Sequence, residues 1–133
     1  HRSWIMELNI PITALYAGLC GLLSVVLANS VLYVRLRGGS QPDWRPDAML
    51  RVQANFVENV PLALVLLLIA ELGGLEAILV HVFGGALVVF RVMHAWGMGT
   101  HPGANYRRLI GAQGTFLIIS ILSAAIVYRF LTY

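Results

Sequence analysis

The sequence contains no lysine and few charged residues of any kind. Charged residues make up 11% of the chain, compared with about 25% in a typical soluble domain. Hydrophobic residues make up 59%. With so few charges the chain cannot cover a water-facing surface, which excludes an ordinary soluble domain. A net charge of +3 in so apolar a chain gives no reason to expect a nucleic-acid partner.

Reactive and metal-binding residues are equally scarce. A single cysteine, Cys20, excludes a disulfide within the chain. His94 and His101 are seven residues apart and have no cysteine or acidic residue nearby, so we expect no metal site. The chain also has no recognisable Ser/His/acid motif. These absences remove the disulfide-stabilised, zinc-dependent and serine-hydrolase classes.

Long apolar tracts are what the chain does contain. Residues 8–34 and 109–128 carry no charge, and each reaches the about 20 residues that span a bilayer as a helix. Residues 59–70 and 77–90 reach that length only with their polar flanks. The sequence therefore predicts an all-α integral membrane protein, a bundle of four transmembrane helices. The predicted helices cover residues 11–35, 47–72, 75–98 and 106–131.

The N-terminal segment is interpreted in two parts. HRSWI, residues 1–5, is predicted to be an expression scar before Met6, and residues 6–133 to form one domain. Pro11 suits the first turn of the first helix, and Thr13 or Asn9 is the expected cap.

Basic residues gather at one end of the predicted helices. They are Arg35, Arg37, Arg45, Arg51, Arg107 and Arg108. The opposite loop, between the second and third helices, is flanked by Glu71 and Glu76. The positive-inside rule then places loops 36–46 and 99–105 in the cytoplasm and both termini on the other side. A bacterial inner membrane is the expected location.

The second predicted helix begins with polar residues where it should enter hydrocarbon, in the segment RVQANFVENVPLALVLLL. Arg51, Asn55 and Glu58 follow i, i+4, i+7 spacing, so they share one face of the helix. Arg91 and His94 lie similarly on the third helix. Because neighbouring helices run antiparallel, we expect all of these groups at one level of one leaflet, together with Arg35 and Arg107.

Charge balance at this level predicts a ligand. An ionisable group facing lipid costs about 2.5–3.5 kcal/mol or more, so these groups should face a bundle interior or a cavity. Glu58 is the one carboxylate among them and the expected partner of Arg91. The surplus positive charge predicts an anionic ligand with more than one carboxylate or phosphate. The alternative, polar contacts that only hold helices together, best suits Gln53 and Asn59.

Four segments resemble those of the MAPEG family, the membrane-associated proteins of eicosanoid and glutathione metabolism. RxQxNxxENxP (Arg51–Pro61) resembles the family's second-helix motif, and VRLR (Val34–Arg37) its first-helix exit. RVMHAWGM (Arg91–Met98) resembles its third-helix segment, and NYRRLIGA leads into the fourth helix as in family members.

The resemblance implies homotrimers of four-helix protomers, with glutathione between neighbouring protomers near the cytoplasmic side. The implied glutathione-binding residues are Arg35, Arg51, Gln53, Asn55, Glu58, Arg91 and His94. Of these, Glu58 is implied to hold the α-ammonium group and the arginines to hold carboxylates. The implied catalytic residue is Arg107 or Arg108, which would stabilise the thiolate.

The implied activity is that of a membrane glutathione transferase used in detoxification. Glutathione would be the co-substrate, without a metal cofactor. Its thiolate would attack hydrophobic small molecules dissolved among the membrane lipids, or reduce lipid hydroperoxides.

Two departures keep other functions open. Met98 and Gly111 stand where many or some family members have tyrosine, which would remove hydroxyl donors near the thiol. A non-catalytic protein that binds glutathione or an anionic lipid is therefore an alternative. A small transporter subunit, with Arg91 and Glu58 lining its pathway, is another; the absence of inverted repeats counts against it.

Overall fold

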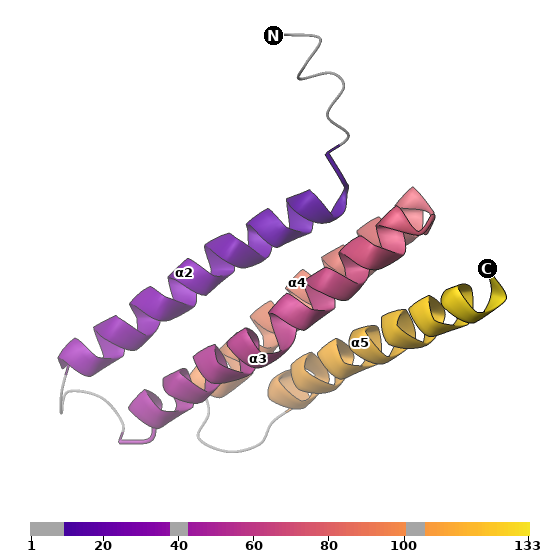
Figure 1. Cartoon of the computed structure of the whole chain (residues 1–133). Helices are drawn as coiled ribbons and strands as arrows, with labels where there is room; N and C mark the ends of the chain where they lie inside the picture. The colour runs from indigo at the N-terminus through magenta and orange to yellow at the C-terminus, as the bar shows by residue number, and fades with distance from the viewer. Residues whose placement is uncertain (1–9, 38–42, 101–105) are drawn as a thin grey trace, which may run out of the picture.

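The computed structural model describes residues 10–37, 43–100 and 106–133, with the backbone alone at Arg45, 97–100 and 106–108. These residues form four helices, shown in Figure 1. They are α2 (Thr13–Arg37), α3 (Arg45–Leu72), α4 (Ala77–Thr100) and α5 (Tyr106–Thr132). The predicted scar at residues 1–5 lies outside the described residues, as do residues 38–42 and 101–105 of the two predicted cytoplasmic loops.

All four helices are long and apolar enough to cross a membrane, which confirms the predicted fold class. Their ends differ from the predicted ones by no more than two residues. α3 begins at Arg45, so Asp47 lies in its first turn, where a carboxylate interacts favourably with the helix dipole. Pro61 lies inside α3 and removes one backbone donor from it.

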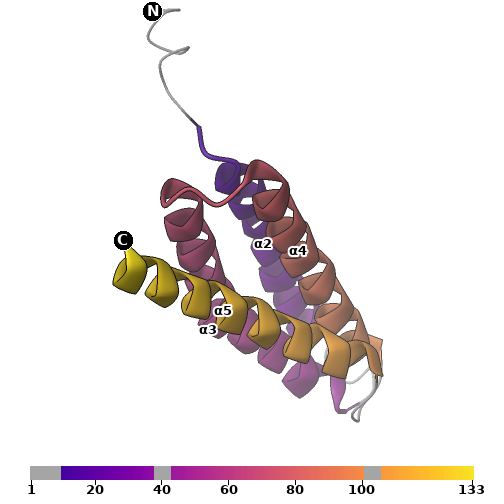
Figure 2. The ribbon, with the colours of Figure 1, turned by 90° about the vertical axis from the view of Figure 1, so that its right-hand side faces the viewer.

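The helices run antiparallel, with α2 and α5 on opposite sides of the α3–α4 hairpin (Figures 1 and 2). α2 packs against α3 and α4 but not against α5 within the described ranges. The start of α2, the turn 73–76 and the end of α5 lie at one end, here called the hairpin end. The end of α2, the start of α3, the end of α4 and the start of α5 lie at the other, here called the arginine end.

The distribution of side chains is that of a protein surrounded by lipid. Large apolar side chains such as Leu22, Leu62 and Leu117 are exposed on the outside. The interior combines an apolar core with four polar residues that are buried among the described side chains. These are Thr13, Arg91, His94 and Thr115. A largely apolar interior beneath an apolar exterior agrees with helices that span a bilayer.

Glycines let α4 and α5 approach closely. A Cβ on Gly111 would lie 2.5 Å from the Phe90 carbonyl oxygen and 2.6 Å from the His94 backbone nitrogen. A Cβ on Gly114 would lie 2.6 Å from the Phe90 ring. Real Cβ atoms do not approach other atoms this closely, so both positions need glycine for this packing. Because Gly111 and Gly114 share one face, that face of α5 is fixed against α4.

The first turn of α2 is capped by a residue of α3 that is far away in the sequence. The Glu71 carboxylate accepts hydrogen bonds from the Ile12 and Thr13 backbone nitrogens, at 2.6 and 2.8 Å. The Thr13 hydroxyl also donates to it, at 2.7 Å. The prediction that Thr13 itself caps this helix is therefore wrong, and Asn9 lies outside the described residues. Glu71 accepts hydrogen bonds from first-turn amide groups that have no acceptor within α2.

A second contact ties α2 to α4 at the hairpin end. The Tyr16 hydroxyl and His81 Nδ1 are 2.6 Å apart. The Tyr16 ring packs on Gly84, where a Cβ would overlap it. Together with Glu71, this contact fixes the hairpin end, and the arginine end is where the candidate site lies.

Candidate functional site

Arg91 is the largest fully buried side chain among the described residues, with 1% of its surface exposed. It lies in α4 on the same face as Val80, Leu87 and His94, all of which are buried. The spacing of these residues fits one helical stripe that faces the core. The guanidinium of Arg91 therefore lies in the interior of the bundle, because Arg91 is on the core-facing side of α4.

Neutral groups surround the Arg91 guanidinium. Nη1 donates to the Thr115 hydroxyl of α5 at 3.4 Å, and Nη2 lies 3.5 Å from His94 Nδ1. The central carbon lies 5.7 Å from the centre of the Phe56 ring of α3, within cation–π range. Nε is buried and has no hydrogen-bond partner. The two hydrogen bonds are long, so the guanidinium is only partly satisfied.

The contact with Arg91 determines the state of His94. A guanidinium only donates hydrogen bonds, so Nδ1 of His94 must accept in this contact. His94 is then neutral and carries its proton on Nε2. The imidazole therefore adds no second positive charge beside Arg91.

Helix α2 contributes a thiol near Arg91. Cys20 of α2 is 2% exposed and lies close enough to the Arg91 guanidinium for an electrostatic interaction. Side chains from α3, α4 and α5 thus contact one cation, and the thiol of α2 lies within range of its field. This group is called the Arg91 cluster below, and its members are Cys20, Phe56, Arg91, His94 and Thr115.

The expected ion pair between Arg91 and Glu58 is wrong. Glu58 is exposed on the outside of α3, whereas Arg91 faces the core. No carboxylate pairs with Arg91 in the part of the chain that the structure describes. Glu58 is two residues from both Phe56 and Val60, so at 100° per residue it lies on the opposite side of α3 from their core-facing stripe.

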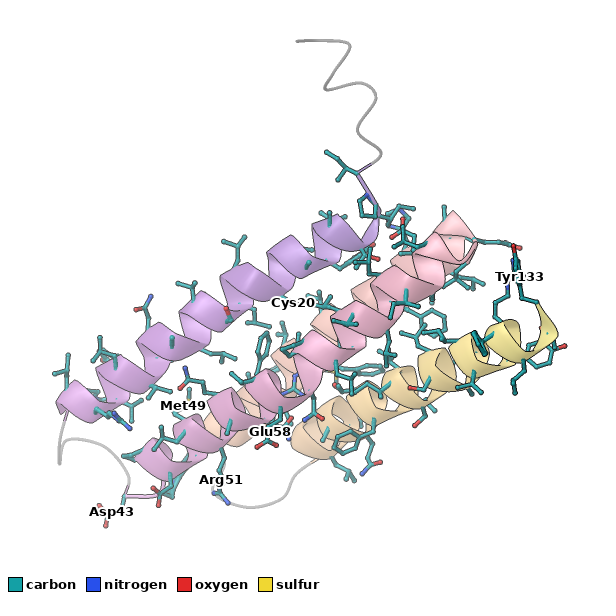
Figure 3. All side chains as sticks on the ribbon, in the orientation of Figure 1. Cys20, Asp43, Met49, Arg51, Glu58 and Tyr133 are labelled. Atoms are coloured by element: carbon teal, nitrogen blue, oxygen red, sulfur yellow. The ribbon has the colours of Figure 1, made fainter. Side chains whose placement is uncertain are left out.

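The other predicted glutathione-binding residues are either exposed or half-buried. Arg35, Arg51 and Glu58 are exposed; Figure 3 shows Arg51 and Glu58 on α3, with Cys20 on the inner side of α2. Gln53 and Asn55 are half-buried. Asn55 Oδ1 is buried without a hydrogen-bond partner, so it is an open acceptor at the edge of the bundle.

The two predicted catalytic arginines lie in the first turn of α5, at the arginine end. The side chains of Arg107 and Arg108 are outside the described residues, as is that of Met98. Which of the two arginines faces the site therefore stays a prediction. Among the described residues, no three His, Cys, Asp or Glu side chains gather where they could hold a metal ion.

Comparison with known proteins shows the family to which the chain belongs. The MAPEG family model matches residues 13–128, which include all four helices almost entirely. The chain belongs to the MAPEG family. It is similar to the inner membrane protein YecN of Escherichia coli strain K12 and of strain O6:H1. Both are 33% identical over 121 residues, covering 86% of this chain and 88% of the relative. No solved structure matches the chain.

Three members of the Arg91 cluster in this MAPEG protein escaped the sequence analysis. Phe56 and Cys20 look like ordinary core residues, and Thr115 is a single hydroxyl in an apolar helix. A signal for Thr115 was present, since Gly111 and Gly114 indicate the face of α5 that packs closely. Thr115 lies one turn after Gly111 on that face.

The structure also changes the interpretation of Gly111. We expected its main effect to be the loss of a tyrosine hydroxyl near the thiol. The contacts show that no side chain fits there, because the α4 backbone occupies the space. In this MAPEG chain, Gly111 serves the packing of α4 and α5.

Proposed function

We propose that the protein is a membrane glutathione transferase, active as a homotrimer that binds glutathione between neighbouring protomers. Family membership supports the general class. The similarity to YecN, named an inner membrane protein, supports an inner-membrane location. In this proposal, loops 36–46 and 99–105 face the cytoplasm, where glutathione is supplied.

One observation carries the proposal: Glu58 is exposed on a membrane-spanning helix. It is the 14th of the 28 residues of α3, about 20 Å from the start of the helix at 1.5 Å per residue. A carboxylate at this depth facing lipid is strongly unfavourable. A second protomer would shield it from lipid, and the ammonium group of glutathione would neutralise it.

The remaining charges fit the rest of glutathione, which carries two carboxylates. Arg35 and Arg51 are exposed near the arginine end and would bind these carboxylates. Gln53, Asn55 and His94 would supply hydrogen bonds. Asn55 Oδ1 supports this assignment as a buried acceptor without a partner.

The reaction needs a cation beside the sulfur. Arg107 or Arg108 would lower the fraction of protonated thiol by stabilising the thiolate. The thiolate would then form a carbon–sulfur bond with a lipid-dissolved electrophile as the leaving group departs. The thiol proton would go to water. With a lipid hydroperoxide, two glutathione molecules would be oxidised to the disulfide while the peroxide is reduced to alcohol and water.

Calorimetric titration of the detergent-solubilised protein with glutathione tests binding, and conjugation to an aryl halide tests turnover. We expect Glu58→Gln to weaken binding, with Glu76→Gln as the matched control because Glu76 is an exposed carboxylate at the hairpin end. We expect Arg107→Ala or Arg108→Ala to reduce turnover more than binding. A wild-type protein that does not bind millimolar glutathione contradicts the proposal.

A non-catalytic binding protein is the second candidate. The packing around Gly111 favours it, because no tyrosine hydroxyl can approach the thiol from that position. Glutathione binding without conjugation or peroxide reduction would select this candidate. If glutathione does not bind, retention of anionic lipid through purification would select its lipid-binding form.

A further inference from the structure

We propose that Thr115 is a positioning residue that holds the Arg91 guanidinium so that its charge acts on the anionic ligand. This inference rests on the proposed function, and it names a residue of α5 that lies outside the four segments resembling the MAPEG family. Thr115 would not touch the ligand. It would act through Arg91.

The hydrogen-bond directions around Thr115 are fixed. Its hydroxyl is fully buried and donates to the Gly111 carbonyl at 2.9 Å. A hydroxyl has one hydrogen to donate, so the same oxygen meets Arg91 with a lone pair. Arg91 Nη1 donates to that lone pair at 3.4 Å. The two hydrogen bonds therefore point the same way, from Arg91 to Thr115 and from Thr115 to Gly111. The Thr115 hydroxyl has one orientation that makes both.

The choice of partners preserves the charge of Arg91. Thr115, His94 and Phe56 contact the guanidinium, and all are neutral. A cation used only for stability would be expected to pair with a carboxylate, because an unpaired buried charge is costly. Neutral partners instead fix the orientation of the Arg91 guanidinium without neutralising its positive charge. Fixed, uncancelled charge is the arrangement that stabilises an anion without reorganisation when the anion binds.

The position of Gly111 extends the argument to the backbone. Gly111 packs against the His94 nitrogen, and its carbonyl receives the Thr115 hydroxyl. The acceptor at the end of the chain therefore belongs to the close α4–α5 contact. Thr115 is held by a rigid element, which a positioning residue requires.

A double-mutant cycle on the full-length protein tests this inference, with the dissociation constant for glutathione as the readout. The variants are Thr115→Val, Arg91→Gln and the double variant. Thr115→Val keeps the shape and removes the hydroxyl. We expect it to weaken binding about tenfold, as for loss of a hydrogen bond to a charged group. In the Arg91→Gln background we expect Thr115→Val to change binding less than twofold.

Thr115→Ser is the matched control, since it keeps the hydroxyl and removes only a methyl group. We expect it to bind within about threefold of wild type. Equal losses in the Val and Ser variants would overturn the inference, because they would indicate packing. Unchanged binding in the Val variant, or the same loss with and without Arg91, would also overturn it. If the Val variant does not fold, Thr115→Ala replaces it in the same cycle. A wild-type protein without glutathione affinity overturns the proposed function itself and is distinguished from these results.

Discussion

The Cα of Gly111 in α5 faces the backbone of His94 in α4, with no room for a single carbon between them. This contact fixes the start of α5 and therefore the backbone of the two predicted catalytic arginines. It also places Thr115 against Arg91, one turn further along.

We expect Gly111→Ala to destabilise the protein by about 1–3 kcal/mol, as for other overpacked interiors. The clashing atoms belong to the α4 backbone and cannot rotate away. Thermal unfolding in detergent measures the effect. Gly85→Ala is the control, because a Cβ there meets nothing within 4 Å. Equal melting temperatures for the two variants would contradict the close α4–α5 contact.

Glu71→Gln removes the charge that caps α2. One amide oxygen cannot replace a carboxylate that accepts three hydrogen bonds, so we expect a loss of about 1–2 kcal/mol. The melting temperature should fall by a few degrees. Glu76→Gln should lower it less, since Glu76 is exposed and its side chain makes no hydrogen bond among the described residues. A wild-type melting temperature for Glu71→Gln would show that the cap does not contribute.

Tyr16→Phe tests the contact between α2 and α4. The substitution keeps the ring on Gly84 and removes the hydroxyl that lies 2.6 Å from His81. We expect a loss of about 1 kcal/mol in unfolding free energy. Tyr33→Phe, at an exposed position of the same helix, should have no effect on stability. A greater loss at Tyr33 would be inconsistent with the structure.

Arg91→Met should separate stability from binding. Methionine fills a similar length without a buried charge, so we expect stability within about 1 kcal/mol of wild type. Glutathione should raise the melting temperature of the wild type more than that of this variant. Arg129→Met, at the hairpin end, should respond to glutathione as the wild type does. Collapse of the ligand-free Arg91→Met protein would show that the fold itself needs the cation.

The helices could be predicted because a segment that crosses the hydrocarbon core of a bilayer must be apolar over about 20 residues. Tracts such as residues 8–34 must be apolar, and the Arg51–Pro61 motif indicated the family. The partner of Arg91 could not be predicted, because helix rotation is set by packing. Gly111 and Gly114 turn one face of α5 onto α4, so Thr115 meets Arg91 while Glu58 points outward.

The cap on α2 escaped prediction for a related reason. Glu71 is 58 residues from Thr13, and no local pattern joins a helix start to the end of the next helix. Only the antiparallel order of α2 and α3 brings them together. Contacts of this kind depend on where two helix ends fall along the bilayer, within a few ångströms.

The Glu71 cap has a consequence for biosynthesis. The amide groups at the start of α2 emerge from the ribosome well before their acceptor does. Until α3 has been inserted, these amide groups lack the Glu71 carboxylate and depend on water. The α2–α3 pair should therefore be more stable than its two helices apart, and a nascent chain truncated before Glu71 should lack this contribution to the packing of α2.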